Sequence, residues 1–340
     1  MLKIKYPIGC LIVALLYLSC EKKESFDITG EVAVKFFTNS ETPGSAPINS
    51  KSYSAVNIPD ATGAWLNLSS NLPAVIKFPV FATKPTSSDV IVSAELDNSL
   101  IAEYNSKNKT NYQPFPVGVL NTTGLAAVLY RGTTRSGDSI TITTNAGMLS
   151  SLTADAYMAP IRLSTVSKPE VGQITTNSGR VTYIVMDVEH RLIKYLATTA
   201  DVQGALITPR TSWTALFNPA LTTTGSIFDG STTTFSRWSA SPGQLDVDIQ
   251  TTRNVTGIRL YSANSATYVP TQIDVYLSTD GINYSLIGSP LKANLTYASS
   301  YNYILFYKAI PARYIRLKLS YVTNTNTQNY RVVEFDVYAN

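Results

Sequence analysis

Short runs in which apolar and polar residues alternate constrain the fold of this chain more than any other feature. In residues 245–249 three apolar side chains alternate with two aspartates, and the same period of two recurs in 273–277, 315–319 and 333–337. Because successive side chains of a strand point to opposite faces of a sheet, this period predicts antiparallel strands with one buried face. Long helical stretches are missing from the sequence, so we expect an all-β protein.

The N-terminal half contains similar strand-like runs between turn-rich polar stretches. These runs cover residues 32–37, 74–81, 89–96, 139–143 and 181–186. Such spacing suits a β-sandwich. A helical turn is predicted over residues 98–105, with Asp97 or Asn98 as its N-cap.

The first twenty residues have the layout of a secretory signal. Lys3 and Lys5 precede an apolar run over residues 8–16, which is shorter than the roughly 20 residues that a membrane-spanning helix needs. A serine then precedes Cys20, and a charged stretch, 21–24, follows. This pattern resembles a bacterial lipoprotein signal, and a transmembrane anchor is the alternative interpretation.

The resemblance implies that a signal peptide, residues 1–19, is removed, that Cys20 is lipidated, and that residues 20–29 form a tether. Cys10 leaves with the signal, so no cysteine remains for a disulfide, a nucleophile or a zinc site. Two or more acyl chains anchor a protein stably. The charged stretch loosely resembles the signal that sends Bacteroidota lipoproteins to the cell surface. We therefore expect a lipid anchor in the outer membrane, with the protein facing the exterior.

Composition narrows the range of partners. At 340 residues the chain is long enough for two domains. The formal net charge is only +4 and charged residues make up 15% of the chain, so the sequence argues against binding to nucleic acid. The 21 tyrosines suit half-buried strand surfaces, and they also suit stacking on a sugar ring.

Four motifs mark the N-terminal half. They are the strand 90–96, the segment 97–105 with its Glu-Tyr-Asn turn, the segment 110–116, and residues 157–163. They resemble the domain of unknown function 1735 (DUF1735), which occurs in surface lipoproteins encoded beside glycan-degradation genes in Bacteroidota. The resemblance implies an immunoglobulin-like β-sandwich over residues 30–190 that serves as a spacer or assembly module. We expect residues 191–204 to form a linker, and the alternative is that residues 192–196 form a final strand.

Six motifs follow in order in the C-terminal part, at residues 212–215, 227–234, 245–249, 275–281, 312–317 and 333–338. Their order resembles the discoidin, or coagulation factor five/eight (F5/8) type C, family, which overlaps carbohydrate-binding module family 32. The resemblance implies a galactose-binding-like jelly-roll sandwich over residues 205–340. The sequence departs from the family pattern at Ser236, where a tryptophan is usual. Either a short insertion moves the tryptophan to Trp238, or Trp238 lies in a different environment.

The resemblance also implies a structural calcium ion in the loop of residues 229–234. The candidate ligands are Asp229 and Thr234, together with Glu334 from the last strand, since calcium prefers oxygen ligands. The alternative is that Asp229 only hydrogen-bonds its own turn and that Glu334 is a solvated strand residue. Calcium in this loop would rigidify it and would not activate water.

For sugar binding, the family uses the loop face near the calcium loop, with an aromatic platform and polar side chains beside it. The candidates by loop position are Arg237, Trp238, Asn264, Tyr268, Tyr330 and Arg331. Core packing is the alternative for Trp238, and a solvated strand end is the alternative for Arg331. The identity of the glycan does not transfer from the family.

The sequence offers no catalytic motif. Its only histidine, His190, lies at a predicted strand end or linker, where packing or exposure is expected. Glycoside hydrolysis needs two facing carboxyl groups, and no motif marks such a pair. Phosphate-binding loops and nucleophile elbows are also missing. We therefore expect no enzyme activity.

Three functions remain open. The leading hypothesis is a non-catalytic, cell-surface glycan-binding lipoprotein in a polysaccharide-utilisation system, with glycans and neighbouring glycan-uptake proteins as partners. The second is an outer-membrane assembly or adhesion protein whose discoidin-like module binds protein or lipid. The third is a cryptic glycoside hydrolase.

Overall fold

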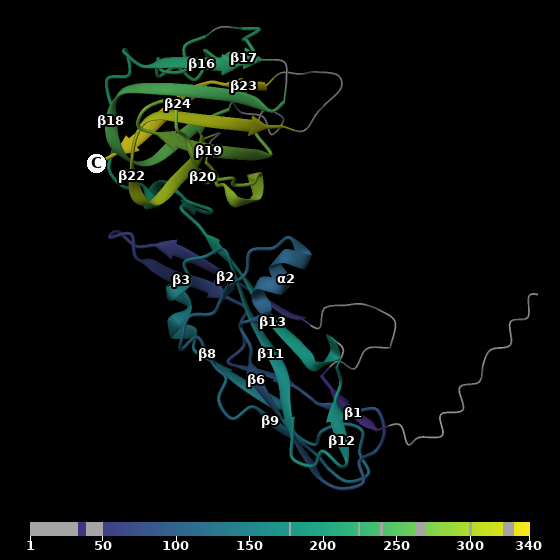
Figure 1. Cartoon of the computed structure of the whole chain (residues 1–340). Helices are drawn as coiled ribbons and strands as arrows, with labels where there is room; N and C mark the ends of the chain where they lie inside the picture. Colours follow the sequence, from purple (N-terminus) through teal and green to yellow (C-terminus); the bar gives the residue numbers. More distant parts are fainter. Residues whose placement is uncertain are drawn as a thin grey trace, which may run out of the picture.

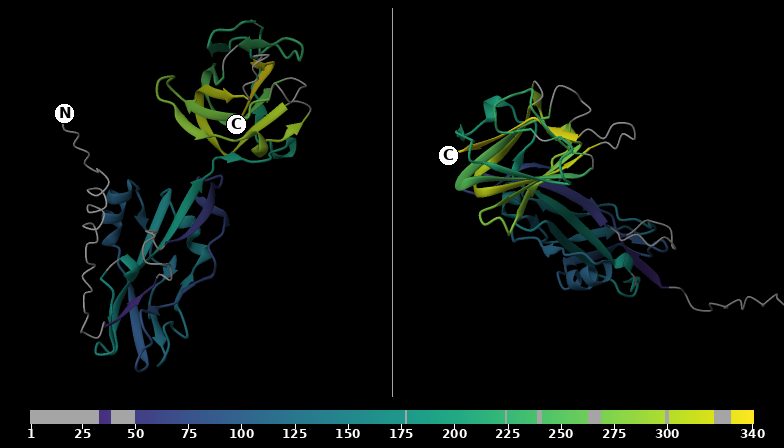
Figure 2. Two further views of the ribbon diagram at one scale, coloured as in Figure 1. Left: turned by 90° about the vertical axis from the view of Figure 1, so that its right-hand side faces the viewer. Right: turned by 90° about the horizontal axis from the view of Figure 1, so that it is seen from above.

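The computed structural model describes residues 33–38, 50–176, 178–223, 225–238, 241–262, 269–298, 301–321 and 330–340. Strands dominate both bodies of the molecule, one formed before and one after residue 191 (Figures 1 and 2). The prediction of an all-β protein is confirmed. No helix in these described ranges has the length and apolar character needed to cross a membrane.

The N-terminal body is built on a seven-stranded sheet, in which β3, β2, β13, β11, β6 and β9 follow one another and β7 pairs with β11. The strands are β2 (Ser50–Pro59), β3 (Trp65–Ser70), β6 (Val90–Leu96), β7 (Gln113–Pro114), β9 (Ala126–Leu129), β11 (Ala156–Val166) and β13 (Val181–His190).

Two smaller sheets complete the N-terminal body. One has the order β4-β10-β8 and the other the order β12-β1-β5. Their strands are β1 (Val34–Phe37), β4 (Val75–Phe78), β5 (Phe81–Ala82), β8 (Leu120–Asn121), β10 (Ile140–Thr144) and β12 (Gly172–Ile174), and the short 3-10 helices η1 (Ala146–Ser151) and η2 (Ser178–Arg180) lie in this body. Apolar side chains from all three sheets form one buried cluster, which gives the body its sandwich core.

The helix α2 (Leu100–Asn108) covers the other face of the large sheet. Its buried Ile101 packs with Met158 of β11 and Val185 of β13. The helix predicted over residues 98–105 is therefore confirmed, although it begins two residues later. The predicted N-cap, Asp97 or Asn98, is wrong: Ser99 occupies that position, and its backbone N–H and hydroxyl both donate to Asp97.

The C-terminal body contains a nine-stranded sheet, ordered β15-β24-β18-β22-β19-β20, with β14, β16 and β21 paired at its sides, and a separate pair, β17 and β23. The strands are β14 (Ile193–Lys194), β15 (Ala205–Leu206), β16 (Thr214–Asn218), β17 (Ser236–Trp238), β18 (Gly243–Tyr261), β19 (Gln272–Ser278), β20 (Ser285–Gly288), β21 (Tyr297–Ala298), β22 (Tyr301–Ser320), β23 (Tyr330–Val332) and β24 (Glu334–Ala339), with 3-10 helices η3 (Thr199–Asp201) and η5 (Lys292–Asn294).

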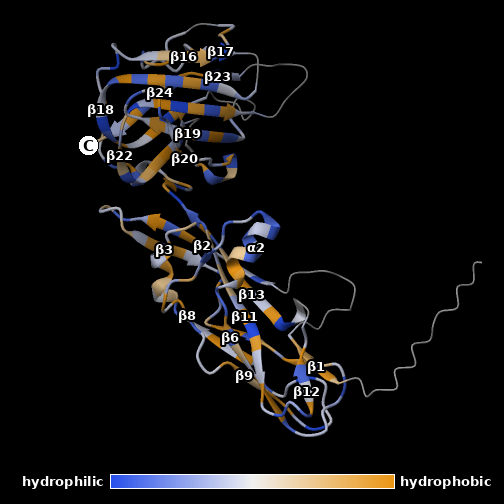
Figure 3. Cartoon of the chain, viewed as in Figure 1, coloured by the Kyte–Doolittle hydropathy of each residue, from blue (hydrophilic) through white to orange (hydrophobic). Residues whose placement is uncertain are grey.

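The alternating pattern of the sequence sets the packing of this body. On β18, Leu245 and Val247 lie opposite Leu317 and Ile315 of β22, and all four are buried. The polar residues between them face outward, so hydrophilic and hydrophobic colours alternate along β18 (Figure 3). The expected half-buried antiparallel strands are present.

Residues 191–204 do not form the expected free linker. Ile193 of β14 pairs with Phe306 of β22 and is 1% exposed inside the C-terminal core. Gly204 lies directly before β15, which pairs with the end of β24. Because β14 and the buried Ile193 dock on the second sheet, this segment belongs to the C-terminal body.

Candidate functional site

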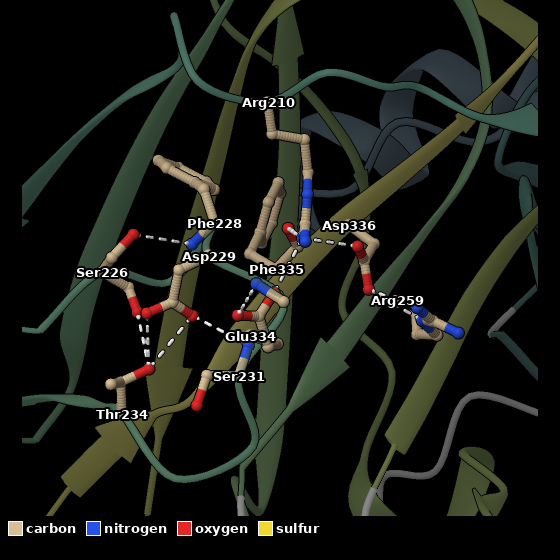
Figure 4. Close-up of polar contacts among 11 residues, drawn as sticks. Arg210, Ser226, Phe228, Asp229, Ser231, Thr234, Arg259, Glu334, Phe335 and Asp336 are labelled. Carbon is tan, nitrogen blue, oxygen red and sulfur yellow. Dashed lines mark hydrogen bonds and ion pairs between the residues drawn. The ribbon is translucent and has the colours of Figure 1, made fainter.

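The loop of residues 229–234 meets the start of β24 in a cluster of carboxyl groups (Figure 4). Glu334, the first residue of β24, is 2% exposed, and its carboxyl group lies within hydrogen-bonding reach of that of Asp229. One Glu334 oxygen also accepts from the backbone N–H of Gly230 at 2.8 Å. The two acids expected from the sequence to share a site are therefore in contact.

Asp229 is also held by its own loop. Its carboxylate accepts from the Thr234 hydroxyl at 2.8 Å and from the Ser231 backbone N–H at 2.9 Å. These contacts form an Asx-type turn, in which a short polar side chain binds the backbone that follows it. Asp229 thus lies beside both Thr234 and Glu334, and Glu334 is buried where the alternative expected it to be solvated.

Arg210 lies on the other side of this cluster and pairs with Glu334, although no sequence motif had pointed to it. Its guanidinium donates to Glu334 at 2.8 Å, to the Phe335 carbonyl at 3.0 Å and to Asp336 at 2.6 Å. Arg259 forms a second ion pair with Asp336 at 2.7 Å. The row Asp229–Glu334–Arg210–Asp336–Arg259 thus begins with two acids and continues with alternating bases and acids in a partly buried cluster (Figure 4).

The two acids of the loop have opposite pKa shifts. Burial, with the hydrogen bond from Asp229 next, raises the pKa of Glu334 to about 7, although Arg210 opposes the shift. The Ser231 backbone N–H, with the Thr234 and Glu334 side chains behind it, lowers the pKa of Asp229. In the absence of a cation, the pair is therefore suited to share one proton.

This donor set fits a hard cation such as calcium. Two carboxyl groups converge and a hydroxyl lies beside them, while backbone carbonyl groups of a tight loop can supply further oxygens. A cation here would replace the shared proton. Across the described ranges no cluster of three or more His, Cys, Asp or Glu side chains could hold a metal ion, so the set has two acids only.

Trp238 and Tyr330 do not form the exposed aromatic platform predicted for sugar stacking. They lie opposite each other on β17 and β23 and are 1% and 4% exposed. Trp238 packs against Phe217 and Tyr321, and the Tyr321 ring lies 4.5 Å from that of Tyr330. The prediction is wrong for both residues because each takes the inward face of a three-residue strand, as the core-packing alternative held for Trp238.

Arg237 and Arg331 occupy the outward face of the same strand pair. Each arginine is the middle residue of its strand, and the two lie directly opposite each other. Both side chains are half-buried. The Arg331 guanidinium stacks 5.1 Å from the centroid of the Phe235 ring, and the Arg237 Nε donates to the Thr222 hydroxyl. Two guanidinium groups on one face provide many N–H donors for an oxygen-rich ligand.

The remaining predicted residues fall into two groups. Asn264, Tyr268 and Cys20 lie outside the described residues. His190 has a structural setting, since its ring lies 4.6 Å from the Trp65 ring and its nitrogens contact Asp155 and the Leu152 carbonyl. This position agrees with the packing role expected for it.

Two family models match separate parts of the chain, one in each body. A model described as the F5/8 type C domain matches residues 209–335, and a second model, described as an N-terminal domain, matches residues 66–170. The C-terminal part of the chain thus carries an F5/8 type C domain. A search of curated proteins found no match.

Among solved structures, one match spans nearly the whole chain and others match only a part of it. A two-domain protein of unknown function from Bacteroides fragilis aligns over 98% of this chain and 100% of its own, with 16% identity and a TM-score of 0.51. A family 32 carbohydrate-binding module from Clostridium perfringens, in complex with GalNAc-β-1,3-galactose, aligns over 40% of this chain and 100% of its own, with 14% identity and a TM-score of 0.33. Another, in complex with galactose, covers 38% and 96%, with 18% identity and a TM-score of 0.31.

Proposed function

We propose that this protein is a non-catalytic, lipid-anchored surface protein that binds a glycan through its F5/8 type C domain and serves a polysaccharide-utilisation system. The observation that carries the proposal is the match of residues 209–335 to that domain family, which overlaps the carbohydrate-binding modules. Cys20, the proposed lipid attachment site, would tie the chain to the outer membrane.

The polar face of the β17–β23 pair is suited to bind an oxygen-rich ligand. Arg237 and Arg331 stand side by side there, and each guanidinium is already held by a neighbour, Thr222 or Phe235. A held guanidinium loses little side-chain freedom on binding, which reduces the entropic cost of a hydrogen bond to a sugar hydroxyl. Because hydrogen bonds at an open site gain little net energy, we expect weak binding by a single module.

A calcium ion is part of this proposal. Asp229, Glu334 and the Thr234 hydroxyl would hold it, and its role would be to neutralise the two acids and to stiffen the loop of residues 229–234. This loop leads directly into β17, so its rigidity would fix the position of Arg237.

The geometry of the acids supports a binding function over hydrolysis. Asp229 and Glu334 contact each other directly, whereas glycosidases separate their two carboxyl groups by about 5 to 9.5 Å to admit the sugar or a water. Glu334 is also 2% exposed, which leaves no room for a substrate beside it.

Affinity electrophoresis of the full mature chain, with calcium present, tests the proposal. Gels would contain galactomannan, arabinogalactan, mucin or yeast mannan. We expect retardation on at least one gel and a loss of retardation in Arg237→Ala and Arg331→Ala, while the control Arg253→Ala, which removes an exposed arginine of β18, still binds. Normal migration of the folded wild-type chain on all gels would contradict the proposal.

The lipid anchor has its own test. We expect the wild-type protein to sediment with outer membranes and to take up a labelled fatty acid, and we expect Cys20→Ser to lose both properties. Fatty-acid labelling of the Cys20→Ser protein would show that the anchor lies elsewhere.

A further inference from the structure

The Glu-Tyr-Asn turn of the N-terminal body has a structural role that points to a second site. The Asn105 side chain accepts from the Thr110 hydroxyl and the Tyr112 backbone N–H, and donates to the Tyr112 carbonyl, each at 2.9 Å. These three hydrogen bonds fix the segment after α2 against the helix. Tyr112 is thereby held beside Tyr104.

Three tyrosine rings meet at this place. The Tyr104 ring lies 5.9 Å from that of Tyr112, edge to face, and 4.9 Å from that of Tyr183 on β13. The buried residues Ile101 and Val185 lie in the same apolar cluster. The rings are therefore supported from below, and each stays half-buried.

The polar groups around these rings are not used by the fold. Within the described ranges, no hydrogen bond joins the three phenol hydroxyls to another residue, and the exposed carboxylates of Glu103 and Asp187 form neither a hydrogen bond nor an ion pair. Burial, followed by the charge of Asp187, raises the pKa of Tyr112, and burial, followed by the charge of Glu103, raises the pKa of Tyr183. Each of these carboxylates thus acts electrostatically on a phenol.

Exposed serines extend the site across β2. Ser50 is paired with Tyr183 and Ser54 with Asp187 in parallel register, so they lie on the same face of the sheet. Ser52 lies between them, and all three serines are exposed. Hydroxyls, carboxylates and aromatic rings are therefore presented together on one face.

We propose that Tyr104, Tyr112 and Tyr183, together with Asp187, form a carbohydrate-binding site on the N-terminal body, separate from the F5/8 type C domain and selective for neutral sugars. A pyranose has an apolar face of C–H groups that packs on tyrosine rings, while its hydroxyls donate to carboxylates. The flanking Asp187 and Glu103 repel acidic sugars, which gives the preference for neutral ones.

Two small substitutions separate binding from a structural role. Tyr112→Phe removes one hydroxyl and keeps the ring, and Asp187→Asn removes one exposed charge, so neither should alter the melting temperature. The matched control is Glu170→Gln, which removes another exposed charge of the same body that has no hydrogen bond or ion pair within the described ranges. We expect the first two to weaken neutral-glycan binding about tenfold each, which corresponds to the loss of one hydrogen bond to the sugar.

The measurement is isothermal titration of the full mature chain with oligosaccharides prepared from yeast mannan, galactomannan and barley β-glucan, and with oligogalacturonate as the acidic comparison. The inference stands if a neutral oligosaccharide binds the wild type and the Glu170→Gln chain equally and binds the other two variants about tenfold more weakly. It is overturned if no neutral oligosaccharide binds, if all chains bind alike, or if only oligogalacturonate distinguishes them. The inference is also overturned if a lysine-rich peptide, and not a sugar, binds at the three tyrosines.

Discussion

Arg210 and Glu334 stand 124 positions apart in the chain, yet a guanidinium nitrogen of the first lies 2.8 Å from a carboxylate oxygen of the second. Arg210 lies in the segment between β15 and β16, and Glu334 is the first residue of β24, the last strand. This contact joins the two ends of the F5/8 type C domain beside the loop of residues 229–234.

The first prediction concerns pH. The folded-state pKa of Glu334, about 7, lies above its ordinary value of 4.5, so protonation favours the fold. The stabilisation is complete below pH 4.5 and is lost as the pH rises through 7. In calcium-free buffer we expect the free energy of unfolding to be lower at pH 8 than at pH 5.5 by on the order of 2 kcal/mol.

Urea denaturation at both pH values measures this difference. Asp229 does not contribute to it, because its lowered pKa keeps it ionised throughout this range. Glu334→Gln cannot ionise and should remove most of the pH dependence. An unchanged pH profile in that variant would contradict the role given to Glu334.

The second prediction concerns calcium. A cation that binds between Asp229 and Glu334 competes with the shared proton, so calcium should stabilise the domain more at pH 8 than at pH 5.5. At a concentration 100 times its dissociation constant, it should add about 2.7 kcal/mol. Thermal unfolding with calcium and with a chelator measures the effect, and Asp229→Asn should abolish it. Equal melting temperatures under both conditions would argue against a cation site.

The third prediction separates packing from recognition at Trp238. Because the indole is fully buried, Trp238→Ala should cost about 3 to 5 kcal/mol of stability. Trp238→Phe should cost much less, since the indole N–H has no hydrogen-bond partner within the described ranges. Denaturation curves measure the stability of both variants, and glycan titrations measure their binding. The Trp238→Phe variant should bind glycan like the wild type. A loss of binding at unchanged stability would show that Trp238 takes part in glycan binding.

The fourth prediction concerns Asn105. Asn105→Ala removes three hydrogen bonds to residues 110–112 and should cost about 2 kcal/mol, since each contributes about 0.5 to 1.5 kcal/mol. It should also expose that segment to limited proteolysis. Asn108→Ala, which removes one side-chain bond to the Tyr104 carbonyl, is the control and should resist cleavage.

The sequence predicted those features that a local pattern determines. The alternation in residues 245–249 and 315–319 reflects burial of one strand face, and the pairing of Leu245 with Leu317 confirms it. The helix at α2 and the Asp229 loop were found for the same reason, because capping residues and Asx turns act over a few positions.

The features that the sequence did not predict depend on distant contacts. In Ser236-Arg237-Trp238 the strand is too short for its period to show which side faces inward, and only the pairing with Tyr330 decides that Trp238 does. No local signal marks Arg210 either, because its partners lie on the last strand. Residues 191–204 resembled a linker because their strand β14 has two residues and becomes stable only on a preformed sheet.

The pairing of β15 with β24 determines how the C-terminal domain carries tension. Ala205 of β15 lies opposite Ala339, whereas Glu334 at the other end of β24 lies opposite Tyr261, where β18 ends. A pull between Ala205 and a ligand held beyond Tyr261 therefore runs lengthwise along β24. Ladder hydrogen bonds are perpendicular to their strands, so such a load shears many of them together and does not unzip them one by one.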